Sequence, residues 1–156
     1  MIKDSGNRRE FSSGAVRDIE EGKGRCDLMP LTVAARVQGV KTGEWDHILY
    51  NIGQFLDEGK RDCLWLYVAL NLFAEQAYSG NAAKMLLEVS KHFEEGAKKY
   101  GENNWQKGIP PSCYIDSAVR HYLKWLRGDK DEPHDRAFVW NLMCCIWEVE
   151  RHNRFE

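Results

Sequence analysis

Acidic, basic and imidazole side chains gather in residues 92–108, HFEEGAKKYGENNWQKG. His92, Glu95 and Lys98 follow one another at intervals of three, so a helix would place them on one face. Carboxylates bind hard divalent cations, and a lysine ammonium binds a phosphate oxygen. Glu94 points about 100° away from Glu95 on a helix, so we expect only one of these carboxylates to face inward. The alternative is an exposed helix whose charges form ion pairs.

A second group of acids surrounds a histidine at a predicted helix start. The group comprises Asp129, Asp131, Glu132, His134 and Asp135. Acidic side chains suit helix N-termini, so capping alone explains part of the pattern. Two helices that present carboxylates across a bundle also build helical metal sites. We therefore expect Glu95 and either Asp131 or Glu132 to hold Mg²⁺ between them, with substrate phosphates as further ligands.

Polar residues flank this second group on both sides. Arg120 and His121 are adjacent on the helix before it, and Asn141 lies within the apolar helix after it. A buried asparagine needs hydrogen-bond partners, which either the protein or a bound ligand supplies.

Cations also gather near the N-terminus, at Arg17, Lys23 and Arg25. Gly22 and Gly24 flank the lysine, and small residues let the backbone approach an anion that the cations neutralise. The segment lacks the GxxxxGK[ST] pattern of a phosphate-binding P-loop. We expect the three cations to fold over a triphosphate, and the alternative is a solvated charge cluster.

Three runs of the chain, in this order, resemble the phage and bacterial dATP/dGTP diphosphohydrolases. These MazZ-type proteins are similar to the all-α MazG-like pyrophosphohydrolases. The runs are GAVRDIEEGKGRCDLMPL at 14–31, HFEEGAKKYGENNWQKGIP at 92–110 and YIDSAVRHYLKWLRGDKDEPHDRAFVWN at 114–141.

The resemblance implies a divalent cation, Mg²⁺ or Mn²⁺, and hydrolysis of a purine dNTP to the monophosphate and pyrophosphate. In phages such a reaction is part of nucleotide metabolism. It implies metal ligands among Glu94, Glu95 and Asp131, to which the acid spacing adds Glu132. It implies that the phosphates or the metal are contacted by Lys98, Arg120, His121 and His134. It also implies that Asn104 and Trp105 lie near the base. We take Glu95, Lys98 and His134 as the catalytic candidates, and Asn141 as a further substrate contact.

The chain also departs from the family pattern. A MazG-type site carries two glutamates at i and i+3, whereas the first of these positions is here Lys91 or His92. The segment 42–80 is an insertion that we expect to form an oligomer interface. Two other functions therefore stay open: a non-catalytic nucleotide-binding protein, and an HD-type phosphohydrolase that uses the pair His134-Asp135 with another histidine (His47, His92 or His121).

The elements that must position these residues are predicted from apolar periodicity. Residues 1–30 are rich in glycine and charge and read as an extended arm, with one short turn around 15–21. After Pro30 the spacing of apolar residues is helical, which predicts one domain, 31–156, built as an all-α bundle of five or six helices. The expected helices are 31–41, 44–56, 62–78, 82–100, 112–127 and 133–150, with Asn81 and Ser112 as N-caps.

Composition limits the class of protein. The formal net charge of −2 lacks the basic excess typical of nucleic-acid binders. No apolar stretch approaches the roughly 20 residues of a membrane span, and the polar start is unlike a signal peptide, so we expect a cytoplasmic protein, in the host cytoplasm if a phage encodes it. The five irregularly spaced cysteines favour buried thiols over disulfides. The helix 62–78 is apolar on nearly every face, which predicts a homo-oligomer.

Overall fold

Helix α4, Ala82–Tyr100, begins and ends at the residues that the sequence predicts. The Asn81 side chain accepts a hydrogen bond from the backbone N–H of Lys84 at 2.9 Å and so caps the first turn. Gly101 follows the last turn with a φ of 90°, which glycine adopts without strain. These local signals fix the helix that forms one wall of the site.

The prediction of an all-α bundle with an N-terminal arm is confirmed. The structure is a computed structural model that describes residues 4–19, 21–40 and 42–152. Over these residues the chain forms six α-helices, two 3₁₀ turns and two short strands. In chain order they are β1 Arg8–Glu10, β2 Val16–Asp18, η1 Cys26–Leu28, α1 Leu31–Gln38, α2 His47–Leu56, α3 Leu64–Tyr78, α4, η2 Asn104–Lys107, α5 Pro111–Arg127 and α6 His134–His152.

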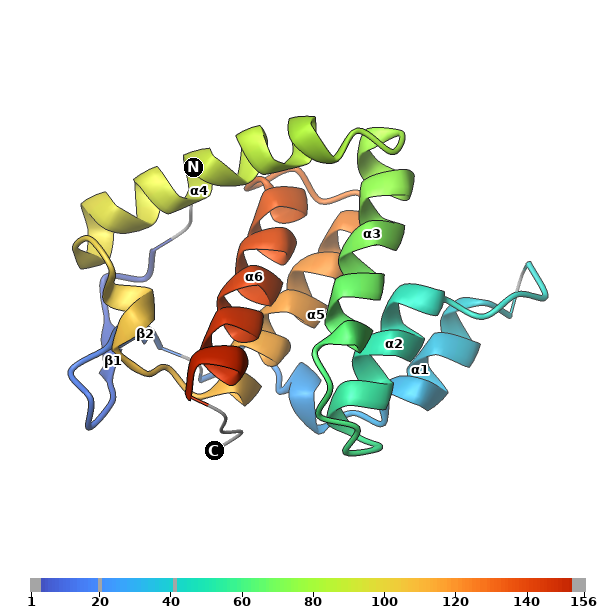
Figure 1. Cartoon of the computed structure of the whole chain (residues 1–156), viewed down its shortest axis with the longest axis horizontal. Helices are drawn as coiled ribbons and strands as arrows, with labels where there is room; N and C mark the ends of the chain where they lie inside the picture. The colour runs from blue at the N-terminus through green and yellow to red at the C-terminus, as the bar shows by residue number, and fades with distance from the viewer. Residues whose placement is uncertain (1–3, 20, 41, 153–156) are drawn as a thin grey trace.

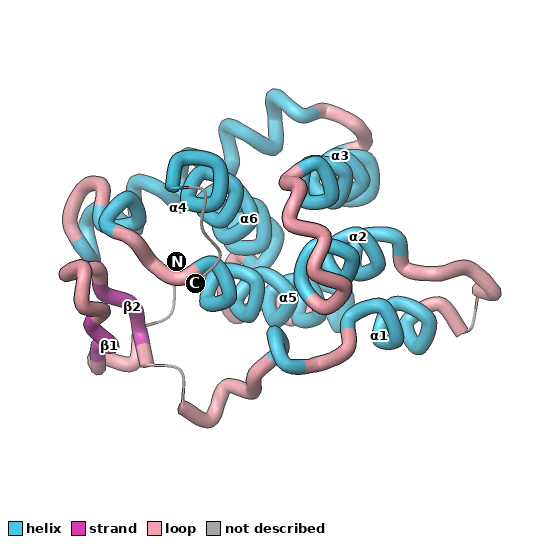
Figure 2. Tube along the Cα trace, turned by 60° about the horizontal axis from the view of Figure 1, so that its bottom comes forward, coloured by secondary structure: helices cyan, strands magenta, loops and turns pink. Residues whose placement is uncertain are grey.

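The helices form a bundle around α5 and α6, which pack side by side (Figure 1). Helix α2 packs against both α1 and α3, and α3 also contacts α6. Helix α4 runs across one end of α3 and α6. Figure 2 shows the β1–β2 hairpin and α1 at opposite ends of the molecule. None of the helices in the described ranges combines the length and apolar character that a membrane crossing requires.

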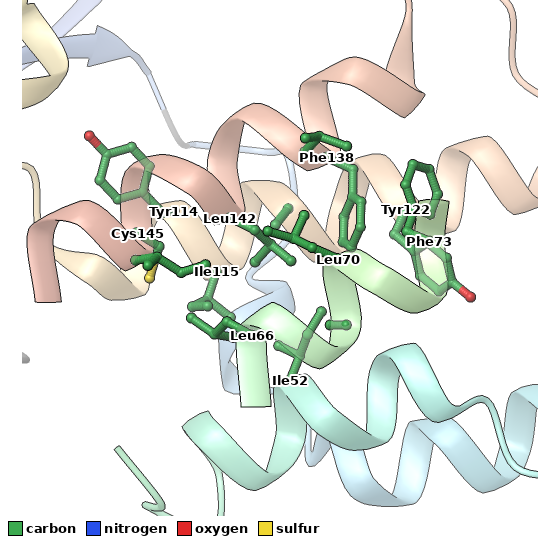
Figure 3. Packing of buried hydrophobic residues seen from close by; sticks show 14 of the residues in the cluster. Ile52, Leu66, Leu70, Phe73, Tyr114, Ile115, Tyr122, Phe138, Leu142 and Cys145 are labelled. Atoms are coloured by element: carbon green, nitrogen blue, oxygen red, sulfur yellow. The ribbon is translucent and has the colours of Figure 1, made fainter. Parts of the chain in front are cut away.

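The core lies where α2, α3, α5 and α6 meet. Ile52, Leu66, Ile115, Phe138 and Leu142 from these helices are buried and lie close together in Figure 3. The helix expected at 62–78 is observed as α3, and most of its apolar side chains are covered by the chain's own helices. The five cysteines, all within the described residues, are thiols that form no disulfide with one another, as the sequence predicts.

The arm differs from the prediction, because it forms a hairpin. Strands β1 and β2 pair antiparallel with Arg9 opposite Arg17, so the segment expected to turn is partly a strand; Glu20 lies outside the described residues. The hairpin turn closes with a hydrogen bond from the Phe11 N–H to the Ala15 carbonyl at 2.9 Å. Ala15 is fully buried, so the arm packs against the helical body.

Two boundaries near the site were also predicted wrongly. Helix α5 begins at Pro111, one residue before the expected cap Ser112, because proline fits the first helical turn, where no intrahelical donor is needed. The segment 102–111, expected as a loop, contains the η2 turn. Asn103 enters this turn with a φ of 61°, which asparagine tolerates better than most residues.

Candidate functional site

A cavity of about 610 Å³ lies between the arm, the C-terminal half of α4, η2, α5 and α6. Its walls thus come from two parts of the sequence that are far apart, residues 4–23 and 92–141. In Figure 1 the hairpin lies below the C-terminal end of α4, and α5 and α6 lie beside both. The volume is within the range of about 300–1,000 Å³ typical of small-molecule sites.

Arg17 on β2 is the central cation of this cavity. Its Nη2 donates to the Ser117 Oγ at 2.8 Å and to the Asn141 Oδ1 at 3.2 Å, and its guanidinium carbon lies 5.2 Å from the centre of the Tyr114 ring. Its Nη1 is buried and has no hydrogen-bond partner among the residues that the structure describes. Arg17 forms no ion pair with a carboxylate in the described part of the chain, so it carries an unneutralised charge into the cavity.

Asn104 holds the strand that carries Arg17. Its Oδ1 accepts from the Val16 N–H at 3.0 Å, and its Nδ2 donates to the Val16 carbonyl at 2.9 Å. The amide is therefore used to fix the backbone of β2. Asn141 is likewise used within the protein, since its Nδ2 donates to the Ala137 carbonyl at 2.8 Å while its oxygen holds Arg17.

Helix α5 adds two cations one turn apart, Arg120 and Lys124. Arg120 donates to the Lys23 carbonyl at 3.2 Å and the Gly24 carbonyl at 2.8 Å, and it pairs with the Asp116 carboxylate. Burial raises the pKa of Asp116, although the charge of Arg120 opposes this shift. Lys23 pairs with a neighbouring carboxylate in the arm, so Arg120 and Lys23 are partly neutralised, whereas Lys124 has no ion pair with any of the described residues.

Aromatic rings line another part of the cavity. The Phe93 ring lies 5.6 Å from the Trp105 ring and 5.9 Å from the Trp140 ring, measured between centroids. The Trp140 Nε1 is buried and finds no hydrogen-bond partner within the described ranges. Such a wall offers apolar faces for a planar ring and a donor for a polar edge.

His92 is the buried titratable group of the α4 wall. Burial, together with the positive charge of Arg136, lowers its pKa to about 4, so the imidazole is neutral at pH 7. Its Nδ1 is buried without a partner. Among the described residues, three of the buried side-chain atoms that lack partners thus belong to residues lining this cavity, and a polar ligand is one way to satisfy them.

His121, Glu132 and His134 bring three metal-ligating atoms within 4.8 Å of one another. The Nδ1 atoms of the two histidines are 2.9 Å apart, and the His134 Nε2 lies 2.8 Å from the Asp131 Oδ1. Burial lowers the pKa of His121 well below its ordinary value, and the neighbouring His134 adds to this shift. A second such group, formed by Asp129 with Asp131 and His134, lies beside it.

Eight of the predicted site residues line the cavity. They are Arg17, Lys23, Asn104, Trp105, Arg120, His121, Glu132 and Asn141. Asp131 and His134 lie in a smaller adjoining pocket, which Glu132 also lines. The roles of all these residues stay predictions.

Four predicted site residues lie outside the cavity lining. Glu94 and Lys98 are exposed on α4, and Arg25 pairs with Asp27 at 2.7 Å. The Glu95 Oε1 accepts a hydrogen bond from the Arg136 Nη2 at 3.0 Å. Within the described ranges, no group of three potential metal ligands includes Glu94 or Glu95, so Mg²⁺ binding between Glu95 and Asp131 stays a prediction without a matching cluster.

The pair His134-Asp135 is divided between two environments. His134 faces His121 and Asp131, whereas the Asp135 carboxylate accepts a hydrogen bond from the Tyr78 hydroxyl at 3.2 Å. Over the described residues, neither metal-ligand group contains Asp135, His47 or His92. The geometry therefore offers no support for an HD-type centre.

Sequence reasoning missed Ser117, Lys124 and Trp140. Lys124 follows Arg120 by four residues, and this helical spacing was a usable signal. Ser117 is an uncharged residue within a helix, and only the approach of Arg17 from a distant strand gives it a role.

Comparison with known proteins identifies the family of the chain. A family model described as dATP/dGTP diphosphohydrolase, N-terminal, matches residues 68–156, which include α4, η2, α5 and α6. Searches of curated proteins and of solved structures found no match. The matched segment covers more than half of the chain, which therefore belongs to the dATP/dGTP diphosphohydrolase N-terminal family, a family named for hydrolases.

Proposed function

We propose that the chain binds a purine deoxynucleoside triphosphate, dGTP or dATP, in the cavity and hydrolyses it to the monophosphate and pyrophosphate. The observation that carries the proposal is the Arg17 guanidinium, a half-buried cation with neutral partners, Ser117 and Asn141, and a spare donor at Nη1. A buried cation without a carboxylate is costly unless an anion pairs with it. A phosphate group would supply that anion.

The cavity lining offers groups for both parts of a nucleotide. Arg17, Lys124 and the partly neutralised Arg120 offer positive charge for a triphosphate. Phe93 and Trp140 offer aromatic faces against which a purine ring stacks favourably. A ligand with a charged tail and a flat base requires both kinds of group.

The proposed reaction adds one water to the α-phosphate. A bond forms between the water oxygen and the α-phosphorus, the bond from this phosphorus to the bridging oxygen breaks, and pyrophosphate leaves. A bound divalent cation, Mg²⁺ or Mn²⁺, supplies neutralising charge and a water of lowered pKa. Arg17 and Lys124 would orient the phosphates and stabilise the charge on the leaving group. Glu95, Lys98 and His134 remain the candidates from the sequence for the chemical step.

The test measures the products formed from each dNTP with Mg²⁺ or Mn²⁺. We expect monophosphate and pyrophosphate from dGTP or dATP, and an HD-type reaction would instead release nucleoside and triphosphate. Arg17→Met removes the charge but keeps much of the length. Hydrogen bonds to charged groups contribute about 1.5–3 kcal/mol, so the KM should rise about 10- to 100-fold.

Arg36→Met is the matched control, because Arg36 is exposed on α1, far along the chain from the site, and stacks on Trp45 with 4.4 Å between its guanidinium carbon and the ring centre. Its kinetics should equal those of the wild-type protein. Tight dNTP binding without any turnover would replace hydrolysis with the non-catalytic nucleotide-binding function. Turnover that is equally insensitive to both substitutions would show that the cavity is not the active site.

A further inference from the structure

The contact between His121 and His134 has the separation of two ligands of one metal ion. Metal–nitrogen distances are about 2.1 Å, so two nitrogens at right angles around one ion are about 3.0 Å apart. The observed distance between the two Nδ1 atoms is 2.9 Å. A simple hydrogen bond between the two rings would give the same distance. The surroundings of the rings must therefore decide between a shared metal ion and a hydrogen bond.

Asp131 fixes which nitrogen of His134 carries the proton. An ionised carboxylate only accepts hydrogen bonds, so the His134 Nε2, 2.8 Å from the Asp131 Oδ1, must be the donor. In the neutral ring the lone pair then lies on Nδ1, the atom that faces His121. A carboxylate behind a histidine in this way is the usual support of a metal-binding imidazole.

Glu132 supplies a third ligand of opposite charge. Its carboxylate oxygen and the nitrogens of His121 and His134 lie within 4.8 Å of one another, as one ion would require. A hydrogen bond between the rings would give this carboxylate no role. The His134 side chain is fully buried, whereas Glu132 is half-buried. The group is therefore closed to solvent on the side of His134 and more accessible on the side of Glu132.

The accessible side of this group of ligands faces the proposed substrate site. His121 and Glu132 belong to the metal-ligand group and also line the main cavity. Arg120 and Lys124 lie on the same helix as His121. Three protein ligands leave coordination positions free for water and phosphate oxygens.

We propose that His121, Glu132 and His134 bind one divalent transition-metal ion, with Asp131 as the residue that positions His134. Two nitrogen ligands favour ions such as Mn²⁺, Co²⁺ or Zn²⁺ over Mg²⁺, which prefers oxygen. The proposal deepens the proposed function by naming the metal class and its ligands, and it rests on that function only for the role of the metal in turnover.

The test measures Mn²⁺ binding to the full chain without nucleotide, after removal of metal with a chelator. Loss of the free-Mn²⁺ signal in electron paramagnetic resonance gives affinity and stoichiometry, and we expect one ion per chain that Zn²⁺ displaces. Glu132→Gln and His121→Asn should each weaken Mn²⁺ binding at least 10-fold. Asp131→Asn should weaken it about 10- to 100-fold, the usual effect of losing the support of a ligating histidine.

Two control substitutions separate this site from the alternatives. Glu95→Gln and His47→Gln should leave Mn²⁺ affinity unchanged, because neither residue belongs to the group. Glu132 is half-buried and glutamine keeps its shape, so Glu132→Gln should fold even if His121→Asn does not. Nitrogen coupling in the pulsed spectrum of bound Mn²⁺ would independently report the histidine ligands.

Each outcome decides a separate question. Unchanged Mn²⁺ affinity in folded Glu132→Gln and His121→Asn variants would overturn the metal site even if dNTPs are hydrolysed. Loss of binding in Glu95→Gln would overturn it in favour of a ligand on α4. Mn²⁺ bound by these residues in a protein that hydrolyses no dNTP would keep the site and refute the proposed function.

Discussion

The burial of His92 predicts how the stability of the protein depends on pH. The side chain packs against Trp140, with 5.4 Å between the ring centres, and its pKa falls from 6.5 to about 4 because burial disfavours the charged ring. The unfolded chain therefore binds a proton between these pH values that the folded chain does not bind. Stability is full above pH 6.5 and is lost as the pH falls towards 4.

The size of the effect follows from the two pKa values. With 6.5 in the unfolded chain and about 4 in the folded chain, lowering the pH from about 7.5 to 5 costs about 2 kcal/mol of unfolding free energy. For a domain of this size that is a fall of about 4–8 °C in Tm. The pKa of His121 is shifted in the same direction, so the wild-type loss should exceed this figure.

The assay is urea denaturation at the two pH values, followed by circular dichroism. His92→Phe keeps an aromatic ring and removes the titration, so its loss of stability between the two pH values should be smaller than that of the wild type by about 2 kcal/mol. His47→Gln, at an exposed position on α2, should match the wild type. An equal pH dependence in His92→Phe and the wild type would refute the argument, because the carboxylates common to both proteins cancel in the comparison.

Four further predictions follow from the structure. Gly39→Ala would place a Cβ 1.5 Å from the Glu44 carbonyl oxygen, so we expect a loss of at least about 2 kcal/mol in urea denaturation, whereas Gly96→Ala meets nothing within 4 Å and should gain about 0.5–1 kcal/mol. Asn104→Ala leaves both polar groups of Val16 without their partner and should cost about 1–3 kcal/mol, while the exposed Gln106→Ala in the same turn should cost little. Deleting residues 1–27 should raise the KM for dNTPs sharply, and unchanged kinetics would show that the arm takes no part in binding. A homo-oligomer stays a prediction, which the exposed apolar residues Leu64 (63%) and Leu87 (70%) favour, and a monomer mass by light scattering at micromolar concentration would reject it.

The helices could be predicted from the sequence because their signals are local. The stripe of apolar residues in 82–100, with Asn81 before it and Gly101 after it, involves only neighbours along the chain. The hairpin could not be predicted in this way. Its strands have three residues each, too short for an alternating pattern, and a side chain 88 residues away holds Val16 in place.

The candidate site could be predicted in part for the same reason. The sequence identified the segments that meet at the cavity, since charged residues and glycines mark them. It could not assign a direction to each side chain. Glu95 and His92 are three residues apart on α4, yet His92 lines the cavity and Glu95 pairs with Arg136. That difference depends on where α6 crosses α4, which is a tertiary contact.

The cavity depends on contacts between the arm and the family segment, 68–156. Asn104 and Asn141, which the sequence suggests as nucleotide contacts, instead hold Val16 and Arg17 of the arm, and Arg120 holds two arm carbonyls. Each contact satisfies polar groups of the helical body and fixes one part of the arm. Among the described residues Arg17 has neutral partners only, so part of the positive charge that favours an anionic ligand comes from outside the segment that identifies the family.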